Sequence, residues 1–496
     1  MDIDVRTEQG VVRGKMEKGV ATFKGIPYAA PPFGANRFRP PQPAERWDGV
    51  RAALTYGPTA PKAPYFPPFD VLFPEVVIPG EDCLNLNIWS PDLGQAQLPV
   101  MVWIHGGAFL NGSGSVPAYD GTRFAQDGVV CVTINYRLGA DGFLSLGDGI
   151  ANLGLLDQIA ALTWVRENIA SFGGDPTNVT IFGESSGGMS VTTLLAMPRA
   201  AGLFRLAIAQ SGAGHHVLSP ATAQRIGQYL AEKLGVEPAR QAIETVPINR
   251  LVQAQQELRI EISRNPNPAR WGEAAANGLP FLPVVDGDLL PERPIDAIAA
   301  GAGANADVLV GSNADEFRLY LVPQGTINAV NEQMLSRAVA AYGLPVAETL
   351  ATYRATRKEA TPGDLLATII TDWYFRIPAI RMAEAHTQQS AGATYMYEFA
   401  WQPPTFEGHL GASHALDLPF VFDNLDKGGF EGLVGTNPPQ QVADAMHAAW
   451  VAFANSGNPG WPQYDLNRRA TMRFDTKQEL VADPRLAERL LWEGLR

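Results

Sequence analysis

Several residue patterns are scarce or missing in this sequence. It has only two cysteines, Cys83 and Cys131, which are too few for a disulfide framework. Cys131 lies in the apolar run 129–134, which indicates a buried thiol on a strand. No run of about 18 apolar residues is present, so we expect no membrane-spanning helix. Residues 1–4 are acidic and no apolar segment follows them, so we expect no secretory signal. These features predict a cytoplasmic protein.

Basic residues are also in the minority. The chain has 38 Lys and Arg against 51 Asp and Glu, which gives a net charge of −13. An acidic surface repels phosphate backbones, so we expect no nucleic-acid partner. No group of His, Cys and carboxylate residues has the spacing of metal ligands, so we expect no metal and no other cofactor. Hydrophobic residues are 46% of the chain and charged residues 18%, as in a globular protein with a deep core.

Apolar runs rich in β-forming residues alternate with helical patterns. Such an alternation predicts an α/β fold, with a large, mostly parallel central sheet flanked by helices. Glycine turns in 3–28 predict small N-terminal antiparallel strands, and the seven prolines of 57–80 predict a long ordered loop. We expect helical insertions in 235–300 and 320–392, and one domain over 1–496. The predicted strands are 98–105, 129–136, 179–182, 206–210, 308–311 and 394–401, and the predicted helices are 154–169, 189–197 and 222–234.

The strongest local signal is the pentapeptide Gly-Glu-Ser-Ser-Gly at 183–187. It follows a predicted strand and precedes a predicted helix, the context of a nucleophile elbow. Its middle residue, Ser185, is the candidate nucleophile, and Glu184 beside it is a candidate supporting residue. The backbone N–H of Ser186 is a candidate donor to an oxyanion, in the positive field of the helix N-terminus.

A second glycine-rich turn, His-Gly-Gly-Ala at 105–108, follows the predicted strand 98–105. Glycine allows backbone N–H groups to approach an oxyanion closely, and acyl transfer needs such donors aimed in advance. We expect the N–H groups of Gly107 and Ala108 to join that of Ser186. In this fold the catalytic residues occur in the order serine, acid, histidine, so His105 is expected to support the site rather than to act as the base.

The base and the acid should therefore follow Ser185. His414 lies in the loop after 394–401, interpreted as the last strand, where a base belongs; His409, in the same loop, is the alternative. The acid should follow the strand 308–311, where Asp315 and Glu316 stand side by side. Spacing alone does not choose between these two carboxylates.

Several longer motifs resemble one family. Segments 172–176 and 183–188 resemble the active-site signature of the type-B carboxylesterases, which include cholinesterases and para-nitrobenzyl esterases. Residues 81–89 resemble the family's second signature, and 23–29 with 37–41 resemble its N-terminal segment. The resemblance extends from about residue 5 to about residue 465. It implies an α/β-hydrolase fold and a serine carboxylesterase that acts on short- to medium-chain or aryl esters through an acyl-enzyme intermediate.

The resemblance also assigns residue roles. It implies Glu316 as the acid and His414 as the base, an ion pair between Arg37 and Glu81, and Ser211 as a buried serine near the catalytic residues.

The sequence also departs from the family pattern. No cysteine precedes Cys83, which implies a free thiol there and membership of the bacterial branch. The loop 57–80 has no Trp, which argues against choline esters. Ser186 and Ala108 replace residues common in the family, but their backbone donors remain.

Three hypotheses for function follow. The first is a carboxylesterase that binds a small-molecule ester and works as a monomer or homodimer. The second is a hydrolase with the same catalytic residues that cuts amides, carbamates or a bulky ester, with its pocket shaped by 57–80 and 260–280. The third is a non-catalytic adhesion protein, which the presence of Ser185, Glu316 and His414 disfavours.

Overall fold

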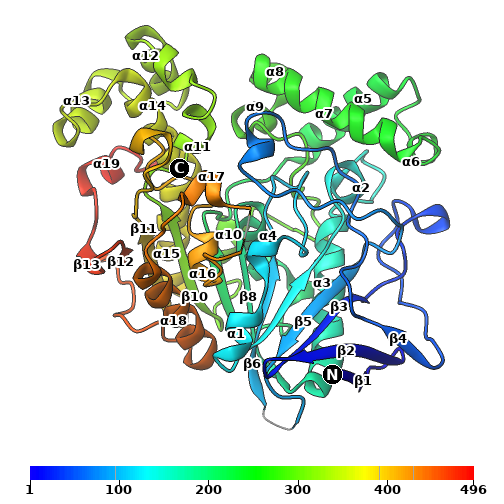
Figure 1. The fold of residues 1–496 in the computed structure, drawn as a ribbon. Coiled ribbons are helices and arrows are strands. Elements are labelled where there is room, and N and C mark those ends of the chain that lie inside the picture. Colours follow the sequence, from blue (N-terminus) through cyan, green and yellow to red (C-terminus); the bar gives the residue numbers. More distant parts are fainter. Residues whose placement is uncertain (95–96, 390, 428, 496) are drawn as a thin grey trace.

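One large sheet organises the computed structural model, which describes residues 1–94, 97–389, 391–427 and 429–495. In these residues thirteen strands join in the order β1-β2-β3-β5-β7-β6-β8-β9-β10-β11-β12-β13, with β4 beside β2 (Figure 1). The strands are β1 (Asp2–Arg6), β2 (Val11–Glu17), β3 (Val20–Pro27), β4 (Val50–Ala52), β5 (Asn85–Ser90), β6 (Leu98–Ile104), β7 (Val130–Ile134), β8 (Gly174–Glu184), β9 (Leu206–Gln210), β10 (Asp307–Asn313), β11 (Thr394–Phe399), β12 (Ala470–Phe474) and β13 (Glu479–Ala482).

Strands β7, β6, β8, β9, β10, β11 and β12 run parallel to one another, whereas β1, β2, β3 and β5 form an antiparallel N-terminal part that joins β7 through β5. This arrangement confirms the predicted α/β-hydrolase fold. The prediction that 394–401 holds the last strand was wrong, because β12 and the antiparallel β13 follow it. Both are short and only partly buried, so no long apolar run marked them.

Helices cover both faces of the sheet. They are α1 (Thr122–Gln126), α2 (Gly139–Phe143), α3 (Leu153–Asn168), α4 (Ser186–Ala196), α5 (Pro220–Leu234), α6 (Arg240–Glu244), α7 (Ile248–Arg264), α8 (Pro268–Trp271), α9 (Glu273–Asn277), α10 (Pro294–Ala299), α11 (Arg318–Leu321), α12 (Glu332–Ala341), α13 (Val346–Thr356), α14 (Pro362–Thr371), α15 (Ile377–Gln389), α16 (Leu418–Val421), α17 (Glu431–Val434), α18 (Gln440–Ser456) and α19 (Leu486–Leu490).

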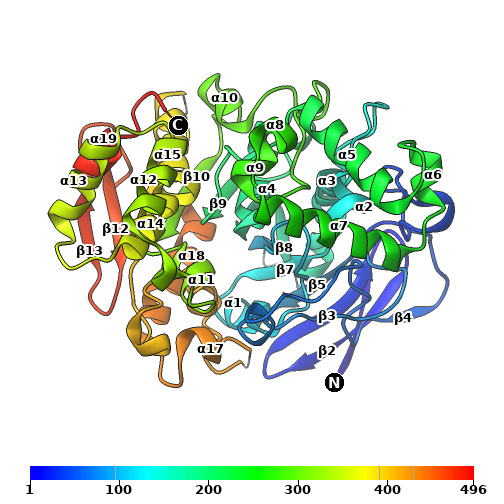
Figure 2. The same cartoon turned by 90° about the horizontal axis from the view of Figure 1, so that it is seen from above.

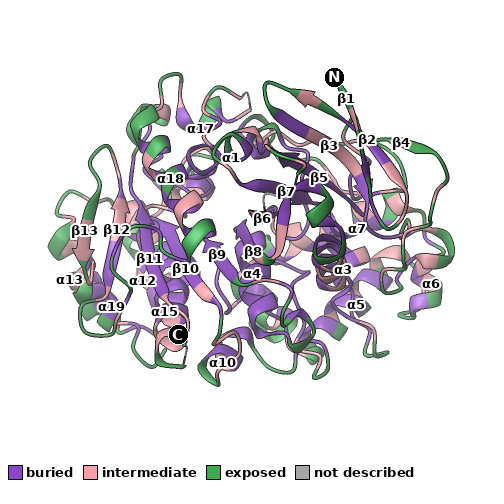
Figure 3. Ribbon diagram, turned by 90° about the horizontal axis from the view of Figure 1, so that it is seen from below, coloured by how far each residue is buried: buried purple, intermediate pink, exposed green. Residues whose placement is uncertain are grey.

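Strand β6 shows why both faces of the sheet must be covered by helices. Val100, Val102 and Ile104 pack into one core with α3, α4 and α15, and Met101 and Trp103 pack into a second core with α1 and α18. Successive side chains of a strand point to opposite faces, so a continuous apolar run must be buried on both. Figure 3 shows the central strands almost entirely buried, with exposure increasing toward the edge strands.

The two predicted helical insertions are present. Helices α5 to α9 form one group and α11 to α14 another, on two sides of the upper end of the molecule (Figures 1 and 2). In the described residues, no helix combines the length and the hydropathy needed to cross a bilayer.

One predicted ion pair was wrong. The guanidinium of Arg37 lies 3.3 Å from the carboxylate of Asp141 and donates to the carbonyls of Glu244 and Val246 at 2.8 and 2.6 Å. Glu81 is exposed instead. Arg37 is almost fully buried, so its contacts are with interior groups of α2 and of the segment after α6.

Candidate active site

Ser185 occupies a tight turn between β8 and α4. Its backbone angles are φ 57° and ψ −124°, in a region that residues other than glycine rarely adopt. A Cβ on Gly183 would lie 2.6 Å from the backbone of Gly187, and a Cβ on Gly187 would lie 2.0 Å from the carbonyl oxygen of Ile104. The two glycines therefore allow the chain to turn directly over β6, and the turn holds the serine at the end of the sheet.

A histidine and a carboxylate line up with Ser185. The Oγ of Ser185 lies 2.9 Å from Nε2 of His414, and Nδ1 of the same ring lies 2.6 Å from Oε2 of Glu316. Ser185 follows β8, Glu316 follows β10 and His414 follows β11. The carboxyl ends of parallel strands meet at one edge of a sheet, and this brings together residues 98 and 229 positions apart.

The alternatives for acid and base lie elsewhere. Asp315 accepts a hydrogen bond from the backbone N–H of Ala412 at 3.1 Å and faces the guanidinium of Arg318. His409 is exposed, and its backbone carbonyl accepts a hydrogen bond from Arg318. In this structure only Glu316 and His414 of the four candidates are aligned with Ser185.

Two buried carboxyl groups flank the ring of His414. Oε1 of Glu184 lies 3.1 Å from Nε2, on the side of Ser185. Burial lowers the pKa of His414, but Glu184 and Glu316 outweigh it and raise the pKa to about 9. Burial raises the pKa of Glu184 to about 8, and the charge of His414 opposes that rise, so the protonation of each group depends on the other. When Glu184 is protonated it no longer raises the pKa of His414, and the neutral ring, held by its contact with Glu316, can then accept a proton.

The predicted oxyanion donors border the same cavity as Ser185. Gly107 and Ala108 line it after β6, and Ser186 is the first residue of α4. Within the described ranges, the N–H groups of Gly107 and Ala108 have no protein acceptor. A Cβ on Gly107 would lie 2.3 Å from the carbonyl oxygen of Asn111, so the turn requires glycine there. The three N–H groups are thus available to a ligand.

His105, the first residue of this turn, packs against it through its side chain. Its Nδ1 lies 2.8 Å from the carbonyl oxygen of Gly106, and its ring stacks on Tyr136 with centroids 4.5 Å apart. Burial lowers the pKa of His105 to about 3, so the ring is neutral at physiological pH. The described hydrogen bonds of this ring do not reach Ser185.

Residues that the sequence analysis did not select hold the loop of His414. Asn313, the last residue of β10, donates from its side chain to the carbonyl of Ser413 at 2.7 Å and to Asp417 at 3.2 Å. Asp417 also accepts from Gln210 at 2.8 Å. The only signal in the sequence for this role was proximity: Asn313 lies three residues before Glu316, and Asp417 lies three residues after His414.

Ser211 lies beside the nucleophile without touching the acid or the base. It has a φ of 48° and is fully buried, and its N–H donates to the carbonyl of Gly311 at 2.9 Å. Its Oγ has no partner in the described chain. Its neighbour Gln210 accepts the N–H of Ser185 at 2.9 Å, so this strand end supports the elbow through its backbone.

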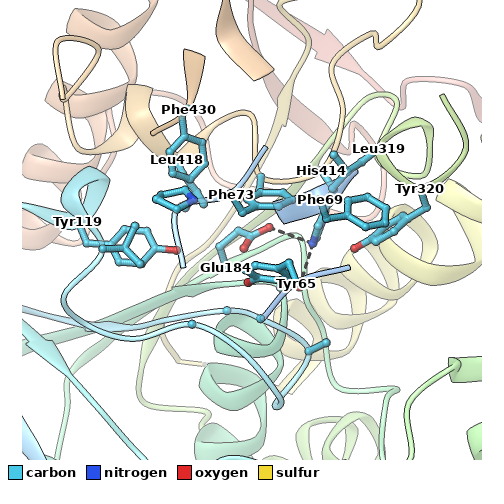
Figure 4. A pocket seen from close by; sticks show the side chains of 18 of the residues that line it. Tyr65, Phe69, Phe73, Tyr119, Glu184, Leu319, Tyr320, His414, Leu418 and Phe430 are labelled. Carbon is cyan, nitrogen blue, oxygen red and sulfur yellow. Dashed lines mark hydrogen bonds and ion pairs between the residues drawn. The ribbon is translucent and has the colours of Figure 1, made fainter. Parts of the chain in front are cut away.

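A cavity of about 110 Å³ opens beside Ser185 and His414. Aromatic and aliphatic side chains dominate its wall, and Figure 4 shows them around the contact between Glu184 and His414. A second cavity of about 210 Å³ also borders Ser185 and includes residues 277–279. Both segments predicted to shape the pocket, 57–80 and 260–280, thus reach the site. The labelled lining residues from 57–80 are Tyr65, Phe69 and Phe73, and those from other segments include Tyr119, Leu319, Tyr320, Leu418 and Phe430.

A buried ion pair holds the 57–80 loop against the oxyanion turn. Nζ of Lys62 lies 3.1 Å from Oε1 of Glu75 and donates to the carbonyl of Gly112 at 2.8 Å. Oε2 of Glu75 accepts from the side chain of Asn111 at 2.9 Å. Asn111 in turn donates its N–H to the carbonyl of Gly107. No cysteine takes part, since both Cys83 and Cys131 are buried free thiols.

A metal site is not apparent here: among the described residues, no three His, Cys, Asp or Glu side chains are grouped to hold an ion.

Comparisons with known proteins agree on one family. A sequence model described as the carboxylesterase family matches residues 2–490. The chain is 41% identical to the para-nitrobenzyl esterase of Bacillus subtilis, over 98% of this chain and 97% of that one. It is 35% identical to the phenmedipham hydrolase of Pseudarthrobacter oxydans, over 97% and 95% of the two chains. A crystal structure of a Geobacillus stearothermophilus carboxylesterase superposes with a TM-score of 0.86 at 40% identity, covering 99% of both chains.

Proposed function

Because the chain belongs to the carboxylesterase family and is a serine hydrolase of carboxylic esters, we propose that Ser185, His414 and Glu316 carry out its reaction. The observation that carries this assignment is the continuous line of contacts from Ser185 Oγ through the ring of His414 to Glu316, at 2.9 and 2.6 Å. The family match also sets aside the non-catalytic hypothesis.

The reaction proceeds in two acyl-transfer steps. Nε2 of His414 takes the proton of Ser185 Oγ as the oxygen attacks the ester carbonyl carbon. The tetrahedral intermediate collapses, the bond to the alcohol oxygen breaks, and His414 returns the proton to that oxygen. Water then attacks the acyl-enzyme with His414 again as base, and the acid leaves from Ser185. Glu316 holds the tautomer in which Nδ1 carries a proton and stabilises the imidazolium.

The N–H groups of Gly107, Ala108 and Ser186 stabilise the oxyanion in both steps. They are fixed before the substrate arrives, so no reorganisation is needed as the negative charge develops. Glu184, Ser211 and His105 support these groups and do not react. The largely apolar walls of the two cavities favour short- to medium-chain or aryl esters.

Initial rates with p-nitrophenyl esters from acetate to long acyl chains test the assignment. Ser185→Ala should lower kcat by roughly 10⁴- to 10⁶-fold. Ser186→Ala is the matched control, since it removes the adjacent hydroxyl and retains the backbone N–H; it should keep most of the activity. Full activity in Ser185→Ala, or a loss confined to Ser186→Ala, would refute Ser185 as the nucleophile.

We also propose that residues 1–496 act as one domain, supported by a single sheet that includes strands from both ends of the chain. A bacterial, cytoplasmic enzyme is supported by a Bacillus subtilis relative and by two free buried thiols. We propose that it acts as a monomer or homodimer. Cell fractionation and light scattering after size-exclusion chromatography test these points.

A further inference from the structure

An unpaired cation borders the candidate active site. Arg259, on α7, lines both cavities that open beside Ser185. Within the described part of the chain, its guanidinium makes no hydrogen bond, ion pair or ring contact with another residue. Guanidinium groups that are partly buried are normally paired with carboxylates, so Arg259 requires an explanation.

No permanent negative charge compensates Arg259 from the cavity wall. Tyr65, Tyr320 and Tyr374 are the titratable groups that act on Arg259. Burial raises the pKa of Tyr65 and Tyr320 well above the usual tyrosine value, so both stay neutral. Burial raises the pKa of Glu184, in the first cavity, to about 8, which disfavours its charged form. Among the described residues that line the two cavities, Arg259 is therefore the one permanently charged group, and it lies on both cavities beside the reacting serine.

The second cavity leaves room for a charged group. Ser263 lies four residues after Arg259 on α7, on the same face of the helix, and it also lines this cavity. Ser263 is exposed, so the cavity reaches solvent near the guanidinium. A carboxylate there would keep part of its hydration while it gains a charge-assisted, bidentate hydrogen bond.

We propose that Arg259 binds a second, unesterified carboxylate of the substrate, so that the enzyme prefers esters whose acyl or alcohol part carries an anionic group. This inference rests on the proposed function and specifies its substrate class. The net charge of −13 repels anions at long range. At physiological salt, however, surface charges are screened beyond about 8 Å, so the guanidinium of Arg259 dominates the field that a bound carboxylate experiences.

Two pairs of substrates test it. The first pair is 4-acetoxybenzoate and 4-acetoxybenzamide, and the second is the 4-nitrophenyl esters of 4-carboxybenzoic and 4-carbamoylbenzoic acid. Members of a pair match in size and differ by one negative charge, placed on the alcohol side in the first pair and on the acyl side in the second. The measured quantity is the ratio of kcat/KM for the anionic and neutral members, at about 0.15 M salt.

In at least one pair, Arg259→Gln should lower this ratio roughly 10- to 100-fold, the effect expected for a hydrogen bond to a charged group. Arg259→Lys should retain part of the ratio. Arg264→Gln is the matched control, because it removes an equal charge from an exposed position on the same helix, and it should leave the ratio unchanged.

The inference is refuted if the wild type hydrolyses the neutral esters and neither ratio changes in Arg259→Gln. It is also refuted if Arg264→Gln changes the ratio as much, since the effect would then be a general one of net charge. If the wild type hydrolyses neither the neutral nor the anionic esters, the proposed function itself fails. Turnover of the neutral esters by Arg259→Gln shows that this variant is folded.

Discussion

The buried pair of Lys62 and Glu75 should stabilise both the fold and the oxyanion turn. The side chain of Lys62 is 0% exposed and that of Glu75 is 10% exposed. Burial lowers the pKa of Lys62, and Glu75 opposes that effect, so the ammonium form depends on its partner. Lys62→Met would leave the carboxylate of Glu75 buried without its cation.

Breaking a buried pair by removing one partner costs about 3–5 kcal/mol of the free energy of unfolding. Removing both charges avoids the unpaired ion, so the loss in Lys62→Met/Glu75→Gln should be smaller than the sum of the single losses by at least about 1.5 kcal/mol. Activity should fall as well. Lys62 donates to the carbonyl of Gly112, whose neighbour Asn111 donates to the carbonyl of Gly107, so loss of Lys62 should displace the turn that contains Gly107. Loss of a whole oxyanion donor costs roughly 10²- to 10³-fold in kcat, so a displaced turn should cost roughly 10-fold.

Urea unfolding of the four proteins in this cycle, with kcat and KM for p-nitrophenyl acetate, measures both effects. We expect kcat to fall while KM changes little, because the oxyanion exists only after attack begins. Additive losses of stability would show that the two charges do not interact. An unchanged kcat in Lys62→Met would show that the 57–80 loop does not position the oxyanion turn.

Three further predictions concern the site and the core. Glu316→Gln should lower kcat by roughly 10³- to 10⁴-fold and move the acid limb of the kcat/KM–pH profile to lower pH, because it removes a carboxylate that raises the pKa of His414. Gly187→Ala should unfold the protein or lower its melting temperature sharply, because the new Cβ would lie 2.0 Å from a carbonyl oxygen of β6. Cys83 and Cys131 should not react with a thiol reagent in the native protein, because burial raises the pKa of both thiols.

Each of these predictions has its own control. Asp315→Asn removes the adjacent carboxylate, which does not contact His414, and should keep the wild-type pH profile; a shift as large as in Glu316→Gln would contradict the assignment of the acid. Gly202→Ala is the control for packing: Gly202 has a φ of 77°, but a Cβ there would meet no atom within 4 Å, so its cost should stay at about 1 kcal/mol. Both thiols should react after denaturation, and rapid labelling of the folded protein would contradict their burial.

The fold could be predicted in outline because each strand carries its own signal. The run 98–104 is apolar at every successive position, and only a sheet covered on both faces buries such a strand. β12 and β13 were missed because they are short and half-exposed at the edge, where the pattern is weak. The predicted pair of Arg37 and Glu81 was wrong because a family resemblance does not show which carboxylate lies nearest to Arg37 in the folded interior. That carboxylate is Asp141.

The sequence alone determined the groups whose geometry is local. The elbow of Ser185 and the turn of Gly107 are each contained in a few consecutive residues, so their glycines and their donors could be recognised along the chain. The family resemblance implied Glu316 and His414, but only the tertiary structure placed His414 against Ser185 and Glu316 against His414. It also decided that Lys62 holds the oxyanion turn and that Arg259 faces the cavity unpaired. These features depend on distances between residues far apart in the chain, and packing of the sheet and its helices sets those distances.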